Sequence, residues 1–233
     1  MAAQTSRYTL RGLLARVQGD LGLRGQALIT KDDVLQWGIE ASDDLAQEFL
    51  WYRTEATAGT TDGTRYYSFP SDLLAVESIY HDGIPLRLVT SRELTIYNYD
   101  WRNASEGTPL WWYRRGYNDY ALHPIPDTTD TDIVTIYYAG LPPVPDEDDD
   151  TFTIPRAHDG AIVKYCLYKA ALKDSSGEGR DRIAVYRGEW EQAKAKFGQG
   201  LNSSAEGELL VLGSDNLPGG VDTFDPFWNA VVT

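Results

Sequence analysis

The chain has 233 residues, enough for one composite domain or two small ones, because independent cores usually form within about 100 to 200 residues. Its hydrophobic fraction of 42%, with 7 Trp, 15 Tyr and 6 Phe, can fill a core, and no apolar run approaches the roughly 20 residues that span a bilayer. The 21 Lys and Arg against 35 Asp and Glu give a net charge of −14, which opposes DNA binding, because non-specific affinity comes from cations that neutralise phosphates.

Two amphipathic helices are predicted at the start of the chain. The first follows Ser6, a candidate N-cap, and ends near Gly19 and Gly22. Its apolar residues share one face: Leu10, Leu13, Leu14, Val17 and Leu21. The second opens at Thr30, an N-cap residue type, and the aspartates of its first turn suit the helix dipole. Its apolar stripe comprises Val34, Trp37, Ala41, Leu45, Phe49 and Tyr52.

Residues 65–139 carry the signals of short strands, with aromatic and β-branched runs separated by turns. The strongest signal is a hairpin in which Asp82-Gly83 joins residues 74–81 to residues 84–89, because Asp-Gly supplies the positive φ angles of a tight turn. The other predicted strands span residues 65–69, 110–114, 120–123 and 133–139. Short strands in this arrangement indicate a small antiparallel sandwich or barrel.

A Pro-rich acidic connector, residues 141–150, leads to a third helix at about residues 155–173, where Pro155 suits the first turn. Its apolar side chains predict burial on two sides: Ile162, Tyr165, Cys166, Lys169 and Leu172 on one face, with Val163, Leu167 and Ala170 on another. A fourth helix carries a packing seam at steps of three and four: Ile183, Tyr186, Trp190, Ala193 and Phe197. Residues 198–233, rich in glycine and without a sustained period, are predicted to form an arm.

These elements predict an α+β fold, in which a four-helix bundle is interrupted by an antiparallel β-sandwich or barrel and followed by an extended C-terminal arm. The expected domains are residues 1–60 and 151–198 for the helical bundle, residues 61–150 for the β insertion, and residues 199–233 for the arm.

The sequence has none of the common catalytic or nucleotide-binding motifs, such as a phosphate-binding loop, a nucleophile elbow or an HExxH pair. The histidines His81, His123 and His158 lack the spacing of zinc ligands, and Cys166 has no companion thiol. The acidic run of residues 146–150 lacks the glycine and distant glutamate of a calcium loop, so a solvated connector is the favoured interpretation. We therefore expect no enzymatic activity, metal or cofactor.

Two aromatic clusters are the candidate interaction sites. Because successive side chains of a strand point to opposite faces, residues 110–114 should place Trp111 and Tyr113 on one face and Trp112 on the other. We assign Trp101, Trp111, Trp112 and Tyr117 to packing within the β insertion and to a subunit or tail-facing interface, and a stacking platform for sugars or bases is the alternative.

The second aromatic cluster lies at the end of the predicted arm and comprises Phe224, Pro226, Phe227 and Trp228. Large apolar side chains on a glycine-rich segment lower solubility unless a surface covers them. We expect that surface to belong to a partner protein or a neighbouring subunit, and the alternative is that the arm folds back on its own bundle.

The order of motifs resembles the head-to-tail adaptor family of tailed bacteriophages, also described as connectors or tail tubular protein A-like proteins. The resemblance runs from about Ile29 to Phe197. Its landmarks are YYSFPSDLLAV at residues 66–76, DGIPL at 82–86, Trp101 followed by GTP at 107–109, HPIP at 123–126, IYY at 136–138, IP at 154–155 and AIVKYC at 161–166. The chain departs from the family pattern at Phe69, where Leu is usual, and at Cys166, where Ala is usual.

The resemblance implies a dodecameric ring that binds beneath the portal protein, contacts tail tube or nozzle proteins, and lets genomic DNA pass through its lumen without specific binding. Such a protein is made in the host cytoplasm, as the absence of a signal-peptide pattern in residues 1–10 also indicates, and resides in the neck of the virion. It has no membrane partner. The alternatives are a carbohydrate-binding module of a tail or surface protein and a hydrolase with an unrecognised carboxylate pair.

Overall fold

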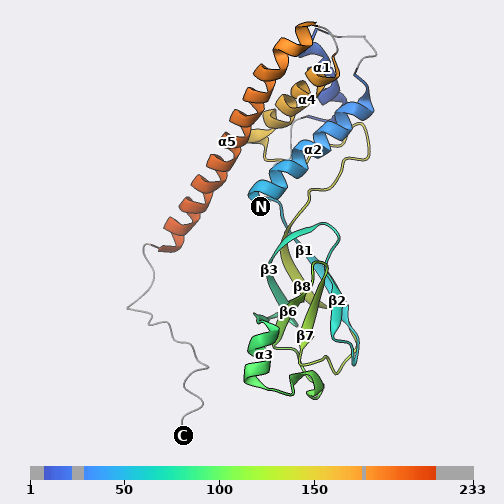
Figure 1. Cartoon of the computed structure of the whole chain (residues 1–233), viewed down its shortest axis with the longest axis vertical. Helices are drawn as coiled ribbons and strands as arrows, with labels where there is room; N and C mark the ends of the chain where they lie inside the picture. Colours follow the sequence, from blue (N-terminus) through green and yellow to red (C-terminus); the bar gives the residue numbers. More distant parts are fainter. Residues whose placement is uncertain (1–7, 23–28, 175–176, 214–233) are drawn as a thin grey trace. The chain divides into compact units, whose positions relative to one another are not determined.

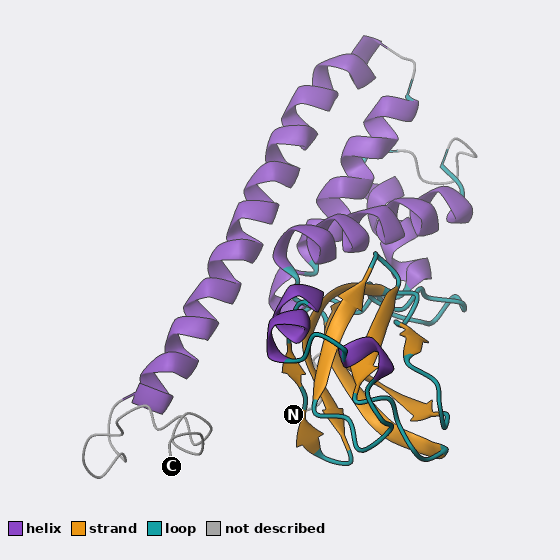
Figure 2. Ribbon diagram, turned by 60° about the horizontal axis from the view of Figure 1, so that its bottom comes forward, coloured by secondary structure: helices purple, strands orange, loops and turns teal. Residues whose placement is uncertain are grey.

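The computed structural model describes residues 8–22, 29–174 and 177–213, and the chain divides into two compact units, residues 1–194 and 195–233. The fold is α+β, as predicted. The long helices are α1 (Leu10–Asp20), α2 (Lys31–Phe49), α4 (Gly160–Lys173) and α5 (Gly177–Gly213) (Figure 1). The strands lie between α2 and α4 in the chain and form two sheets, which we call the β module (Figure 2).

Threonine side chains start both N-terminal helices. The Thr9 hydroxyl accepts a hydrogen bond from the backbone N–H of Gly12 at 3.1 Å and caps α1, so the predicted cap at Ser6 is wrong. The predicted cap at Thr30 is confirmed, and it forms a capping box with Asp33. Helix α2 ends at Phe49, because Leu50 adopts a left-handed conformation with a φ of 49°.

The helices α1, α2 and α4 pack against one another. Helix α4 is buried on two sides, as predicted, although Leu172 is 49% exposed. Its buried residues are Ala161, Ile162, Val163, Cys166, Leu167, Ala170 and Ala171. The predicted seam residue Trp190 of α5 is buried, and its ring lies 5.0 Å from that of Tyr165 in α4. The closure of four helices into one bundle stays a prediction.

Helix α5 extends to Gly213, past the predicted end of the fourth helix and the predicted start of the arm near residue 198. A glycine inside a helix costs only about 1 kcal/mol relative to alanine, so Gly198 and Gly200 do not end it. The helix-favouring residues that follow the glycines outweigh this penalty: Leu201, Ala205, Glu206, Glu208, Leu209 and Leu210.

The β module contains two sheets of four strands each. The first has the order β1 (Arg53–Thr60), β8 (Asp130–Gly140), β3 (Leu73–His81) and β4 (Ile84–Pro85). The second has the order β2 (Tyr66–Ser68), β7 (Asp119–His123), β6 (Trp111–Arg115) and β5 (Arg87–Leu88). The predicted hairpin is confirmed, with φ angles of 50° at Asp82 and 72° at Gly83.

Three features of the β module differ from the prediction. Strand β1 was not predicted, because its run of Thr, Ala and Gly has none of the aromatic or large aliphatic residues that identified the others. Residues 84–89 form two strands in different sheets rather than one strand. Strand β5 pairs with β6 in parallel, so the expectation of a purely antiparallel module is wrong there.

The two sheets share one core, which makes the module a sandwich. Its buried residues come from both sheets and from the loops between them: Phe69, Leu73, Ile79, Leu86, Trp112, Tyr120, Leu122, Val134, Ile136 and Tyr138. A second cluster fills the other face of the second sheet, where α3 (Ser91–Tyr97) and the 3-10 turn η1 (Trp101–Asn103) contribute Leu94 and Trp101. Helix α3 was not predicted, because seven residues are too few to show a helical period.

A close contact with α2 gives the first testable prediction. A Cβ atom added to Gly38 would lie 2.2 Å from the ring of Phe152, which is 2% exposed and cannot move into solvent. We expect Gly38→Ala to lower the free energy of unfolding by about 1–3 kcal/mol through overpacking, as measured by urea denaturation. Gly188→Ala is the matched control, because a Cβ there meets nothing within 4 Å and should be neutral or stabilising.

Candidate functional site

The structure buries two of the four aromatic residues that the sequence analysis assigned to an interface. Trp112 is 6% exposed and packs edge-on against Phe69 in the core between the sheets, with ring centroids 6.3 Å apart. Trp101 is 2% exposed and packs edge-on against Tyr113 at 5.5 Å. Both rings are therefore enclosed by their own chain and cannot present a face to a ligand.

Trp111 and Tyr117 remain accessible, in different places. Trp111 lies half-buried on the face opposite Trp112, as the alternation predicted, and stacks on His123 with ring centroids 5.6 Å apart. Tyr117 is 74% exposed in the turn between β6 and β7. The structure therefore brings Trp101 and Trp111 together around His123 and leaves Trp112 and Tyr117 apart from them.

Helix α3 and the turn after it add exposed apolar side chains that were not predicted as an interaction site. Ile96, Tyr97 and Tyr99 are 77%, 77% and 89% exposed. The ring of Tyr97 lies 5.5 Å from that of Trp111, so this exposed group continues onto the second sheet. Exposed tyrosines of this kind are enriched in protein interfaces.

Three arginines lie over aromatic rings at the second sheet and at η1, and together with Tyr66 we call them the arginine face: Arg65, Tyr66, Arg102 and Arg115. The Arg115 guanidinium lies 4.0 Å from the ring centroid of Tyr66, and that of Arg102 lies 4.6 Å from Trp101. Arg65 approaches the same tryptophan at 5.3 Å and donates a hydrogen bond to the carbonyl of Arg102 at 2.9 Å. The run WWYRR in β6 was the sequence signal that could have indicated this face.

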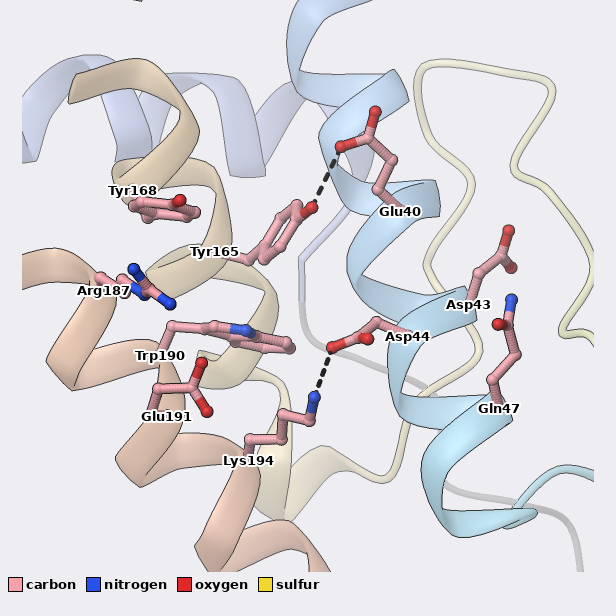
Figure 3. A pocket seen from close by; sticks show the side chains of 10 residues that line it. All are labelled: Glu40, Asp43, Asp44, Gln47, Tyr165, Tyr168, Arg187, Trp190, Glu191 and Lys194. Carbon is pink, nitrogen blue, oxygen red and sulfur yellow. Dashed lines mark hydrogen bonds and ion pairs between the residues drawn. The ribbon is translucent and has the colours of Figure 1, made fainter. Parts of the chain in front are cut away.

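An open pocket of about 530 Å³ lies between α2, α4 and α5 (Figure 3). Its lining combines aromatic and charged side chains: Glu40, Asp43, Asp44, Gln47, Tyr165, Tyr168, Arg187, Trp190, Glu191 and Lys194. The Tyr165 hydroxyl donates to Glu40 at 3.1 Å, and Lys194 donates to Asp44 at 2.8 Å while also pairing with Glu48. These contacts join the three helices across the pocket.

The pKa values of the pocket follow from these pairings. Burial would raise the pKa of Glu40, but hydrogen bonds from Lys169, Gln36 and Tyr165 outweigh it and lower that pKa. Burial raises the pKa of Asp43, which has no compensating hydrogen bond among the described residues. Since Glu40 and Asp44 are engaged with cations, the pocket resembles an ion-paired helix joint more than an acid–base centre.

The cysteine and the acidic connector, which could in principle react or bind metal, are buried or paired within the chain. Cys166 is buried, and burial raises the pKa of its thiol, which keeps it protonated and unreactive. In the acidic connector, Asp150 accepts hydrogen bonds from the backbone of Asp146 and Glu147, and Asp148 pairs with Arg11 and Lys31. Within residues 8–22, 29–174 and 177–213, no group of three or more acidic, histidine or cysteine side chains could hold a metal ion, and no helix could cross a membrane.

Two buried histidines predict a pH dependence of stability. His81 and His123 are 6% and 4% exposed, and burial lowers the pKa of both below their ordinary value of 6.5. Because the unfolded chain then binds more protons, their contribution to stability is complete above about pH 6.5 and declines as the pH falls below it. We expect the urea midpoint to drop between about pH 7.5 and pH 5.5, and this slope should flatten in the double variant His81→Gln, His123→Gln.

The predicted anchor residues of the arm, Phe224, Pro226, Phe227 and Trp228, lie outside the described residues. A family model described as the SU10 adaptor protein matches residues 8–208, a range that begins just before α1 and ends within α5. No curated protein gives a significant match.

Proposed function

Because the chain belongs to the SU10 adaptor protein family, a family of phage adaptors, we propose that it forms the head-to-tail adaptor ring that docks beneath the portal and joins it to the tail. The family match over residues 8–208 carries this proposal, since it includes both the helices and the β module. The ring has twelve copies, and the virion neck is its location.

The structure supports an assembly role in two ways. The pocket between α2, α4 and α5 is crossed by ion pairs of Lys194 and by the Tyr165–Glu40 hydrogen bond, which suits a rigid part rather than a catalytic centre. The β module exposes tyrosines and arginines, the residue types that most often carry binding energy at protein interfaces.

The terminal residues Phe224, Pro226, Phe227 and Trp228 are the contact with the portal or a neighbouring subunit. Aromatic side chains of this size bury enough surface to anchor a segment, and residues 214–233 contain no lysine or arginine. The segment therefore suits a receptor that is apolar and neutral or basic.

The net charge of −14 per chain suits a ring through which DNA slides, because an acidic lumen repels phosphates. The isolated ring should accordingly show no salt-sensitive binding to double-stranded DNA in a mobility-shift assay at low salt. Retardation that fades as salt is added would contradict this part of the proposal.

Electron microscopy of the protein mixed with its purified portal tests the main proposal. We expect twelvefold density added to the face of the portal that points toward the tail, and labelled protein in the neck of mature virions. Portal rings that stay bare over a range of protein concentrations would overturn the role. The burial of Trp101 and Trp112 counts against the alternative of a carbohydrate-binding module, and binding on a glycan array would favour it.

A further inference from the structure

The arginine face carries positive charge that the chain does not neutralise. Although carboxylates outnumber cations by 35 to 21, none of the described carboxylates forms an ion pair with Arg65, Arg102 or Arg115. The lysines of the helices behave differently, since Lys164, Lys169, Lys173 and Lys194 each pair with an acidic residue. Ion pairing within the described chain therefore does not account for the charges of these arginines.

The aromatic rings lie close under the arginines and limit where the guanidinium groups can move. A guanidinium stacked on an aromatic ring keeps its N–H groups at the edge, where they can donate to a carboxylate. Arg102 and Arg115 are exposed, so their guanidinium groups can be reached by a partner. The neighbouring carboxylate of Asp119 accepts a hydrogen bond from Ser68 at 3.0 Å instead of pairing with Arg115.

The outer face of the first sheet, on the opposite side of the sandwich, carries glutamates and tyrosines in place of arginines. We call it the glutamate face: Glu55, Glu77, Tyr80 and Tyr137. Glu55 is exposed, lies opposite Tyr137 in the register of β1 and β8, and pairs with no cation of the described chain. Tyr137 is 39% exposed, and its ring lies 5.4 Å from that of Tyr80. Glu77 pairs with Arg53 at 3.0 Å at the margin of this face.

We propose that the arginine face of one copy binds the glutamate face of the next copy, so that the β modules form a continuous ring of head-to-tail contacts. Two different surfaces on opposite sides of one module are what a heterologous interface requires, and rotation of each copy relative to the last closes such contacts into a ring. Guanidinium groups then meet carboxylates, and exposed tyrosines cover one another. The inference rests on the proposed ring, and it assigns the surfaces through which the ring closes.

Reversing the charges on each face in turn tests whether the two faces bind each other. One variant carries Arg102→Glu and Arg115→Glu, and the other carries Glu55→Arg and Glu77→Arg. Each alone should self-associate at least tenfold more weakly than the natural chain in analytical ultracentrifugation, because like charges meet at every contact. An equimolar mixture should recover assembly, since the reversed face of one variant matches the reversed face of the other. Misfolded variants cannot be rescued by mixing.

The matched control reverses two exposed cations outside the β module, Arg156→Glu with Lys196→Glu, and should assemble normally. Natural protein that stays monomeric with and without portal, reversed variants that assemble like the natural chain, or a mixture of folded variants that fails to recover would each overturn the inference. So would an arginine variant that assembles normally but loses DNA binding shown by the natural ring. Rings that form through these faces yet leave portals bare would instead overturn the proposed function alone.

Discussion

Deletion of Gly219 to Thr233 is expected to abolish decoration of purified portal rings while the protein remains folded. The deleted segment lies beyond every helix and strand of the described chain, so the cores of the helices and of the β module keep all their residues. It contains Phe224, Phe227 and Trp228, and aromatic anchors of this kind each contribute about 2 kcal/mol or more when buried in a partner. Loss of three anchors should weaken docking by several orders of magnitude.

Negative-stain electron microscopy and sedimentation with portal rings measure this effect. A shorter deletion, Asn229 to Thr233, is the matched control, because it keeps the aromatic residues and should leave decoration intact. The full-length variant Phe224→Ser, Phe227→Ser, Trp228→Ser should behave like the long deletion. If the long deletion still decorates portals at natural concentrations, the terminal segment does not anchor the ring.

The sequence predicted the elements whose signals are local. Thr30 with Asp33 marked the start of α2, and Asp82-Gly83 marked the turn between β3 and β4, because each depends only on residues close in the chain. Strand β1 escaped prediction, since its small residues form a strand through pairing with β8, which begins seventy residues after β1 ends. Helix α3 escaped for a related reason, because Leu94 is buried by contacts with Trp101 and Tyr113 rather than by a long apolar stripe.

The candidate site likewise was predictable where the signal was local and unpredictable where it depended on contacts between distant residues. Alternation along β6 correctly placed Trp111 and Trp112 on opposite faces. It could not reveal that α3 covers one of those faces, which is why the residues expected at an interface proved partly enclosed. The arginine face was visible in the sequence only through the run WWYRR, which holds Arg115, because Arg102 comes from η1 and Arg65 from the approach to β2. Which side chains stack across strands depends on register, and register is a property of the folded sheet.

Trp112→Ala is expected to destabilise the β module by about 3–5 kcal/mol, the range found when a large buried aromatic side chain is truncated. Trp112 lies between the two sheets, where it packs against Phe69, and neither sheet can close the space without losing its own contacts. Urea denaturation followed by tryptophan fluorescence measures the change. Tyr117→Ala is the control, because that side chain is 74% exposed and its loss should change stability by no more than about 0.5 kcal/mol.

The same pair of variants separates a packing role from a binding role for these aromatic residues. If Trp112 serves packing, its variant should lose stability and assembly together, and lowering the temperature or adding an osmolyte that favours the folded state should recover both. If Trp112 were a stacking surface for a sugar, the variant would keep its stability and lose only binding. A Trp112→Ala protein with the unfolding midpoint of the natural chain would therefore show that the tryptophan lies outside the core between the two sheets.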